Sequence, residues 1–116
     1  MRIWAVIRFQ FEGVHRWIDA KEGVKFLSYP HRHMFHCEAW VEEKHDNRDV
    51  EFIEAKRYIL NKVLNDAGFS LRMIGYSCEQ IATDIIKFMK EKYGEDRKYK
   101  CSVAEDGENG SLVEEE

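Results

Sequence analysis

The sequence lacks the cysteine pairs that mark small disulfide-rich proteins and all-cysteine metal sites. Its three cysteines, Cys37, Cys78 and Cys101, are odd in number and show no CxxC spacing. This pattern argues against a disulfide framework and against an all-cysteine zinc site, so we expect three reduced thiols.

Long apolar runs are also missing. No stretch approaches the roughly 20 apolar residues that span a bilayer. The first residues, MRIWAVIRFQFEG, alternate apolar and polar side chains and carry no secretory cleavage pattern. We therefore expect a cytoplasmic protein without a membrane segment.

Charge of one sign is scarce. The formal net charge is -4, and lysines and arginines alternate with acidic residues instead of forming a basic stripe. Because neutralisation of phosphates supplies most of the affinity for nucleic acid, this composition argues against such a partner.

What the sequence does contain fits one globular unit. Of 116 residues, 44% are hydrophobic and 13% aromatic, which is enough for a single core. The only proline is Pro30, and no repeat or linker divides the chain. We expect residues 1–116 to form one domain.

Hydrophobic periodicity predicts the order of the elements. Alternation predicts strands over residues 3–11, about 33–43 and 98–105, and Asn109–Gly110 predicts a hairpin turn into a last strand. Spacings of three and four predict one helix from Asp49 to near Gly68, and another that begins at a Ser77–Gln80 capping box and stops at Gly94. The expected fold class is α+β, ββααββ, with an antiparallel sheet.

Histidines cluster around the second predicted strand. His31 and His33 lie two apart and share a face, and His15 follows the first strand with the parity of Phe9 and Phe11. If the two strands pair, the three imidazoles meet, and three histidines with an open position are typical of a catalytic zinc. The alternative is that the HxH pair is a surface or hydrogen-bonded core feature, which is the commoner case for this spacing.

The other polar candidates fit a metal site less well. His36 has the opposite parity, and His45 lies in the charged turn EKHDNRD. Cys37 shares the parity of His33 but lies roughly 13 Å farther along an extended strand, so we expect it in the core.

Two motifs around these histidines resemble the 6-pyruvoyl- and 6-carboxy-tetrahydropterin synthase family. The family's phenylalanine and histidine four apart match Phe11 and His15 in FEGVH. Its HGH motif matches residues 31–33, with Arg32 in place of glycine.

Three downstream motifs continue the resemblance over nearly the whole chain. The VEF segment at 50–52 is similar to the family's valine-aspartate-phenylalanine, and YSCEQ at 76–80 is similar to its proline-threonine-x-glutamate-asparagine. The valine-x-glutamate of the late strand is matched by Val103 and Glu105.

The resemblance implies a fold, a cofactor and a substrate class. The fold is the T-fold, with two helices on one face of a four-stranded sheet and subunits that join into a barrel, usually as a homohexamer of two trimers. The cofactor is Zn²⁺ on His15, His31 and His33, and the reaction is that of a lyase on a dihydropterin triphosphate or related compound of the tetrahydropterin or 7-deazaguanine (queuosine precursor) route. Glu105 and Glu79 are the implied substrate-binding residues, with Glu105 on the 2-amino pyrimidine edge of the ring. Without the resemblance, Glu105 reads as a solvated residue at a strand end.

The chain departs from the family pattern at two catalytic positions. Leu27 stands where the family has a cysteine, and the segment between the helices has Asp66 but no histidine. Tyr29 and Cys78, and with them Ser28, are the candidate replacements, because a tyrosine near a metal can transfer a proton and a thiol at a helix N-terminus can have a lowered pKa. Loop packing and a capping turn are the structural alternatives for these residues.

Three functions are compatible with these sequence features. They are a zinc-dependent lyase of the pterin synthase type, a zinc hydrolase of a nucleotide-like compound, and a protein that binds a pterin or purine without turning it over.

Overall fold

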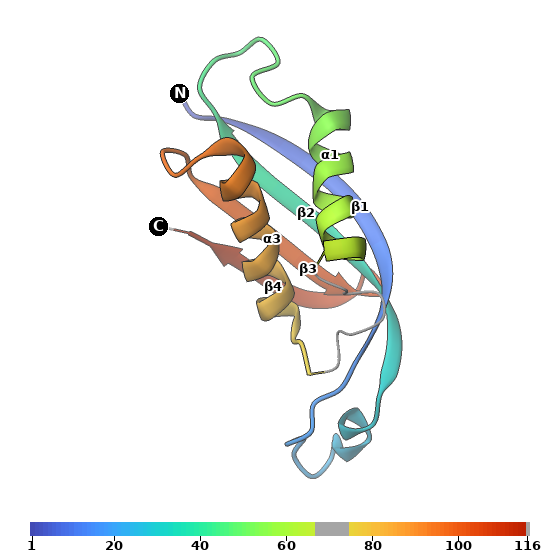
Figure 1. Ribbon diagram of the computed structural model, residues 1–116. Coiled ribbons are helices and arrows are strands. Elements are labelled where there is room, and N and C mark those ends of the chain that lie inside the picture. The colour runs from blue at the N-terminus through green and yellow to red at the C-terminus, as the bar shows by residue number, and fades with distance from the viewer. Residues whose placement is uncertain (67–74, 116) are drawn as a thin grey trace.

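The protein is one antiparallel sheet covered by two helices, seen in a computed structural model that describes residues 1–66 and 75–115 (Figure 1). The strands are β1 (Ile3–His15), β2 (His31–Glu43), β3 (Tyr99–Glu105) and β4 (Asn109–Glu114), and the helices are α1 (Phe52–Asn61) and α3 (Cys78–Tyr93). A 3₁₀ turn (Lys25–Ser28) lies between β1 and β2, and a π turn (Lys62–Asp66) continues α1. The sheet order is β1-β2-β3-β4, with every neighbouring pair antiparallel. The predicted α+β class and ββααββ order are confirmed.

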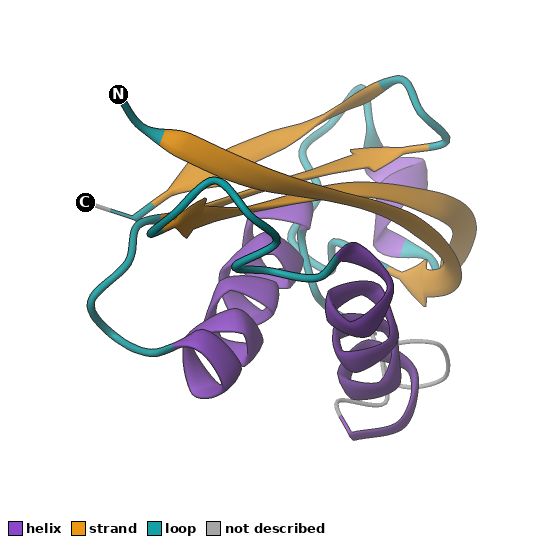
Figure 2. Ribbon diagram, turned by 90° about the horizontal axis from the view of Figure 1, so that it is seen from above, coloured by secondary structure: helices purple, strands orange, loops and turns teal. Residues whose placement is uncertain are grey.

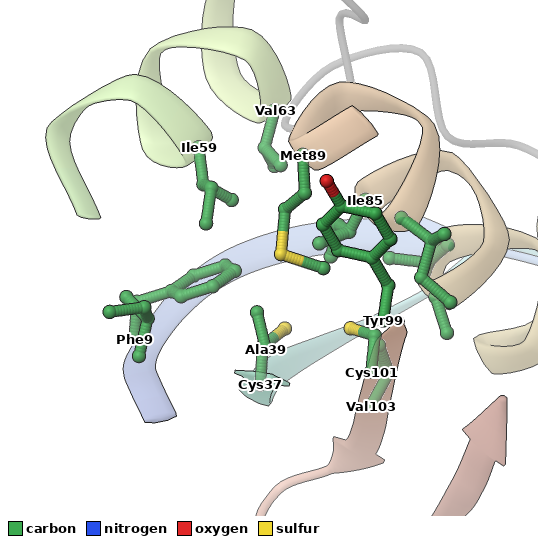
Figure 3. Close-up of a cluster of buried hydrophobic side chains, with 14 of the residues drawn as sticks. Phe9, Cys37, Ala39, Ile59, Val63, Ile85, Met89, Tyr99, Cys101 and Val103 are labelled. Atoms are coloured by element: carbon green, nitrogen blue, oxygen red, sulfur yellow. The ribbon is translucent and has the colours of Figure 1, made fainter. Parts of the chain in front are cut away.

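Both helices pack on the same face of the sheet (Figure 2). Alternate residues of each central strand face them, so Phe35, Cys37, Ala39 and Val41 of β2 are all buried. Helix α3 contributes Ile81, Ile85 and Met89 to this core, and α1 with its π turn adds Ile59 and Val63. Figure 3 shows Ile59, Val63, Ile85 and Met89 facing the sheet. Burying this one face supplies the main driving force for folding, since each large apolar side chain removed from water contributes about 1.5–3 kcal/mol.

The helix ends follow local capping rules. The capping box of Ser77 and Gln80 is present, and α3 ends at Gly94, whose φ of 101° a residue with a Cβ rarely adopts. Helix α1 begins later than expected because Glu51, not Asp49, accepts the N–H groups of Ile53 and Glu54. The expected stop near Gly68 lies outside the described residues.

The predicted bounds of the first two strands were wrong. The ladder between β1 and β2 runs on to the pair His15 with His31, four residues past the expected end of the first strand at 11 and two before the expected start of the second at 33. The continued pairing of 12–15 with 31–34 overrides the weak strand preference of Gly13.

The predicted Asn109–Gly110 turn was also wrong. The chain reverses at Asp106 and Gly107, whose φ values are 55° and 73°, and Glu108 N–H donates to Glu105 O at 2.9 Å. Asp-Gly supports such a turn as well as Asn-Gly does. Gly110 instead lies in β4, where an added Cβ would come within 2.0 Å of the Val103 carbonyl oxygen.

The expectation of three reduced thiols is confirmed. All three cysteines are free and buried, and burial raises the pKa of Cys37 to about 12. Among the described residues, no helix is long and apolar enough to cross a membrane.

Candidate metal centre

Three histidines meet at the end of the β1–β2 ladder. His15 pairs directly with His31, and His33 lies two residues further along β2 on the same face. The ring centroids are 4.6 Å apart for His15 and His31, 5.2 Å for His15 and His33, and 4.9 Å for His31 and His33. The expectation that strand pairing brings these three together is confirmed.

A carboxylate completes the group. Glu105, at the end of β3, pairs with Phe35 of β2, and its Oε2 lies 2.8 Å from His15 Nε2 and 3.5 Å from His33 Nε2. One ligand atom from each of the four residues lies within 4.8 Å of all the others. We call His15, His31, His33 and Glu105 the histidine cluster, and this cluster could hold a metal ion.

The outer hydrogen bonds of the histidines orient all three rings. His15 Nδ1 lies 2.8 Å from the Tyr76 carbonyl oxygen, and His31 Nδ1 lies 2.8 Å from the Tyr29 carbonyl oxygen. A carbonyl oxygen only accepts, so in both rings the hydrogen is on Nδ1 and, in the neutral form, Nε2 keeps its lone pair. His33 Nδ1 lies 2.7 Å from Asp106 Oδ2. Each ring can therefore turn Nε2 toward the centre of the cluster.

Two properties of the rings suit metal binding. His15 is buried to 8% exposure, and this burial lowers its pKa below the usual 6.5, despite the opposing effects of the Tyr76 carbonyl and Glu105. The neutral imidazole, which is the ligand form, is thus favoured at pH 7. His33 Nε2 is buried and, within the part of the chain that the structure describes, makes no hydrogen bond, since even Glu105 Oε2 lies 3.5 Å away. This state is costly for a polar atom, and a metal ion would relieve it.

The cluster opens into a pocket of about 520 Å³. His15, His31 and Glu105 line its sheet side. The remaining wall comes from the β1–β2 connection, the start of α3 and β4, with residues 16, 17, 27, 75–79 and 109–111. The pocket thus joins a corner that could hold a metal ion to a space large enough for a small heterocycle.

The two glutamates assigned to substrate lie in different surroundings. Glu105 belongs to the histidine cluster, a role that the sequence analysis did not give it. Glu79, in the first turn of α3, also lines the pocket, and its Oε1 accepts a hydrogen bond from Ser111 Oγ at 2.8 Å.

The candidate catalytic residues differ in position. Cys78 lines the pocket, but its expected low pKa was wrong: burial, followed by the charges of Glu105 and Glu79, raises the pKa of its thiol to about 11. Tyr29 is 71% exposed and touches the cluster through its carbonyl oxygen, which His31 uses. Ser28 Oγ donates to the Lys25 carbonyl oxygen, as a packed turn residue does.

Leu27 and Asp106 both lie close to the cluster, but the sequence analysis identified only Leu27 as a residue of interest. Leu27, which stands where the pterin synthases that the sequence resembles have a cysteine, lines the pocket with an apolar side chain. Asp106 was missed by the sequence analysis, although it directly follows Glu105 in an Asp-Gly pair that predicts a tight turn. His36 and His45, excluded from the ligand set by sequence, are both exposed and lie outside the cluster.

Comparison with known proteins assigns no family. No family model matches the chain, and no curated protein sequence matches it.

Proposed function

We propose that this protein is a zinc-dependent lyase of the pterin synthase type that acts on a dihydropterin or a related purine-like compound. The observation that carries the proposal is the convergence of three imidazoles and one carboxylate, of which His15, His31 and Glu105 line a pocket of about 520 Å³. The motifs around Phe11, His15 and residues 31–33 supply the substrate class.

Zinc suits the donors of the cluster. Three neutral imidazoles with one further position form the ligand set of many catalytic zinc sites. Within the described residues, His33 Nε2 makes no hydrogen bond and is free to act as a ligand atom. When bound, zinc would supply a Lewis acid for the hydroxyl and carbonyl oxygens of a substrate side chain.

The residues of the pocket divide the remaining work. Glu105 is the carboxylate nearest the ligand atoms, and in this proposal it accepts a proton from the substrate side chain. Glu79 lies outside the cluster and can accept the paired N–H groups of a pterin or guanine edge, a charge-assisted contact that orients the ring. This division assigns ring binding to Glu79 in preference to Glu105, because Glu105 Oε2 already lies 2.8 Å from His15 Nε2.

A second candidate function is ligand binding, or hydrolysis of a nucleotide-like compound, without synthase activity. Leu27 in the pocket wall and the raised pKa of Cys78 favour it, because neither residue offers a thiolate at neutral pH. General acid–base groups typically contribute 10² to 10⁴-fold to a rate, so their loss would leave slow chemistry or none.

Product analysis of purified, zinc-loaded protein tests the proposal. Conversion of dihydroneopterin triphosphate to a 6-pyruvoyl or 6-carboxy product is expected at a slow rate in the wild type and at a higher rate in Leu27→Cys, which returns a thiol to the pocket wall. Leu27→Ser, of similar size but without a thiol, is the matched control.

The possible results separate the two candidates. A rise in melting temperature with a pterin ligand, abolished in Glu79→Ala, but no product from wild type or Leu27→Cys, would favour a binding protein. A protein that binds neither zinc nor a pterin would contradict both.

A further inference from the structure

The β3–β4 turn brings a second carboxylate to the back of His33. Asp106 Oδ2 lies 2.7 Å from His33 Nδ1, and Asp106 Oδ1 accepts the N–H of Met34 at 2.9 Å. The two oxygens of one carboxylate thus serve two neighbouring residues of β2.

The backbone of the turn holds this carboxylate in place. The Asp106 N–H donates to the Met34 carbonyl oxygen at 2.7 Å, and Asp106 has a φ of 55°. Aspartate tolerates this left-handed conformation better than most residues. Because the main chain and the side chain both bond to Met34, the carboxylate has little freedom to swing away from the His33 ring.

We propose that Asp106 is a positioning residue that fixes the orientation and tautomer of His33 for metal binding. The inference rests on the proposed zinc function and deepens it. With Nδ1–H donated to Asp106, the ring presents the lone pair of Nε2 to the centre of the cluster. A carboxylate behind a metal-binding histidine also makes the ring a stronger ligand, and removing such a partner typically weakens metal binding 10 to 100-fold.

Asp106 differs in kind from the partners of the other two histidines. His15 and His31 bond to the backbone carbonyls of Tyr76 and Tyr29, which no substitution removes. Within the part of the chain that the structure describes, His33 is the histidine of the cluster whose Nδ1 partner is a side chain. Its orientation can therefore be changed by one substitution that leaves every ligand in place.

Asp106→Asn makes a sharp test because an amide cannot reproduce both hydrogen bonds. If the amide oxygen accepts from Met34 N–H, the amide NH₂ faces His33 Nδ1. The ring must then place its hydrogen on Nε2, where it blocks metal binding. If the amide turns over, it loses the bond to Met34 instead.

The experiment measures zinc affinity by competition with a chromophoric chelator, starting from metal-free protein. We expect Asp106→Asn to bind zinc 10 to 100-fold more weakly than the wild type. Glu108→Gln, which removes an exposed charge from the same turn, is the control and should change the affinity less than twofold. Co²⁺ in place of zinc gives a second readout, since its visible spectrum should differ between Asp106→Asn and the wild type.

The outcomes separate this inference from the proposed function. Zinc affinity unchanged in Asp106→Asn, but lost in His33→Ala, would overturn the role of Asp106 and leave the zinc site standing. A fall in affinity that merely matches a fall in the unfolding free energy of the metal-free protein would show a structural role and also overturn it. If the wild type binds no zinc, both the inference and the proposed function fail.

If Asp106→Asn does not fold, nitrogen NMR of the zinc-loaded wild type decides, because the inference requires the His33 hydrogen on Nδ1.

Discussion

At the scale of single residues, the histidine cluster depends on side chains that point to one face of a sheet. His33 and His36 lie on the same strand, three residues apart, and therefore face opposite sides. His33 joins the cluster on the helix side, whereas His36 is exposed beside Gly107. His36 therefore provides a matched control for substitutions of the proposed metal ligand His33.

We predict about one zinc per chain in the wild type and the loss of most of it in His33→Ala. Removing one of three imidazoles leaves too few ligands for tight binding, whereas His36→Ala should keep the full zinc content. Metal analysis by mass spectrometry after dialysis measures both. Equal zinc in the two variants would mean that the ligand set is wrong.

At the scale of elements, an ion pair joins the segment before α1 to the segment before β3. Arg97, just before β3, donates from Nη1 to Asp49 Oδ2 at 2.6 Å and to the Glu42 carbonyl oxygen at 3.0 Å. Both side chains are largely buried, at 11% and 13% exposure. Asp49, expected to begin a helix, is used for this link instead.

This ion pair predicts a contribution to stability that acid removes. The hydrogen bond from Arg97, with a further one from Lys44 N–H, lowers the pKa of Asp49 from 3.8 to about 2. The folded state therefore favours the charged carboxylate. The contribution of this carboxylate to the free energy of unfolding is fully present above pH 4 to 5 and is lost as the pH falls toward 2.

The measurement is urea unfolding of the wild type and Asp49→Asn at pH 6 and pH 2. The stability difference between them should shrink by about 2 kcal/mol between these pH values. Asp46→Asn, an exposed acid in the same loop, should show no such change. A pH-independent difference for Asp49→Asn would show that Arg97 does not favour its ionised form.

The elements also show how far the sequence could predict the fold and the site. Period-2 and period-3.6 patterns gave the order ββααββ, and the parity of His15, His31 and His33 predicted their meeting, because these features depend only on which face a side chain occupies. The turn could not be chosen between Asp106–Gly107 and Asn109–Gly110, since both pairs suit a tight reversal and the register of β3 with β4 decides. Glu105 reaches the cluster through the register of β2 with β3, which pairs it with Phe35, and Asp106 reaches His33 from the turn that follows. Both placements depend on strand pairing, so the roles of these residues beside the histidines could not be predicted from the local sequence.

At the scale of the whole molecule, the sheet has two unpaired edges and one face without helices. In the described residues, β1 and β4 are edge strands, and the face away from the helices has no covering layer (Figure 2). That face carries Trp4 and Trp40 with the Lys100 ammonium between them, 4.6 and 4.8 Å from the ring centroids. Long free edges favour pairing with another chain.

We therefore predict a homo-oligomer in solution, a hexamer of two trimers if the resemblance to the pterin synthases holds. Pairing of β1 with β4 of another copy would close the edges into a barrel. Light scattering at micromolar concentration measures the mass. The mass of a single chain would count strongly against this assembly.

The pair His15 with His31 is also the point at which the chain leaves the sheet for the connection 16–30. A metal ion bound by both residues would therefore cross-link the two ends of this connection. Local opening of the connection would then require the metal to dissociate from at least one of them. Trypsin should reveal this, because Lys21 and Lys25 are exposed within the connection, whereas Lys44 and Arg48 are exposed at the opposite end of the hairpin. Zinc should slow cleavage at Lys21 and Lys25 and leave the rate of cleavage at Lys44 and Arg48 unchanged. The same digest therefore contains both the test and its control. Equal cleavage of the connection with and without zinc would mean that its own hydrogen bonds, such as Trp17 N–H to the Leu27 carbonyl oxygen at 2.8 Å, hold it closed.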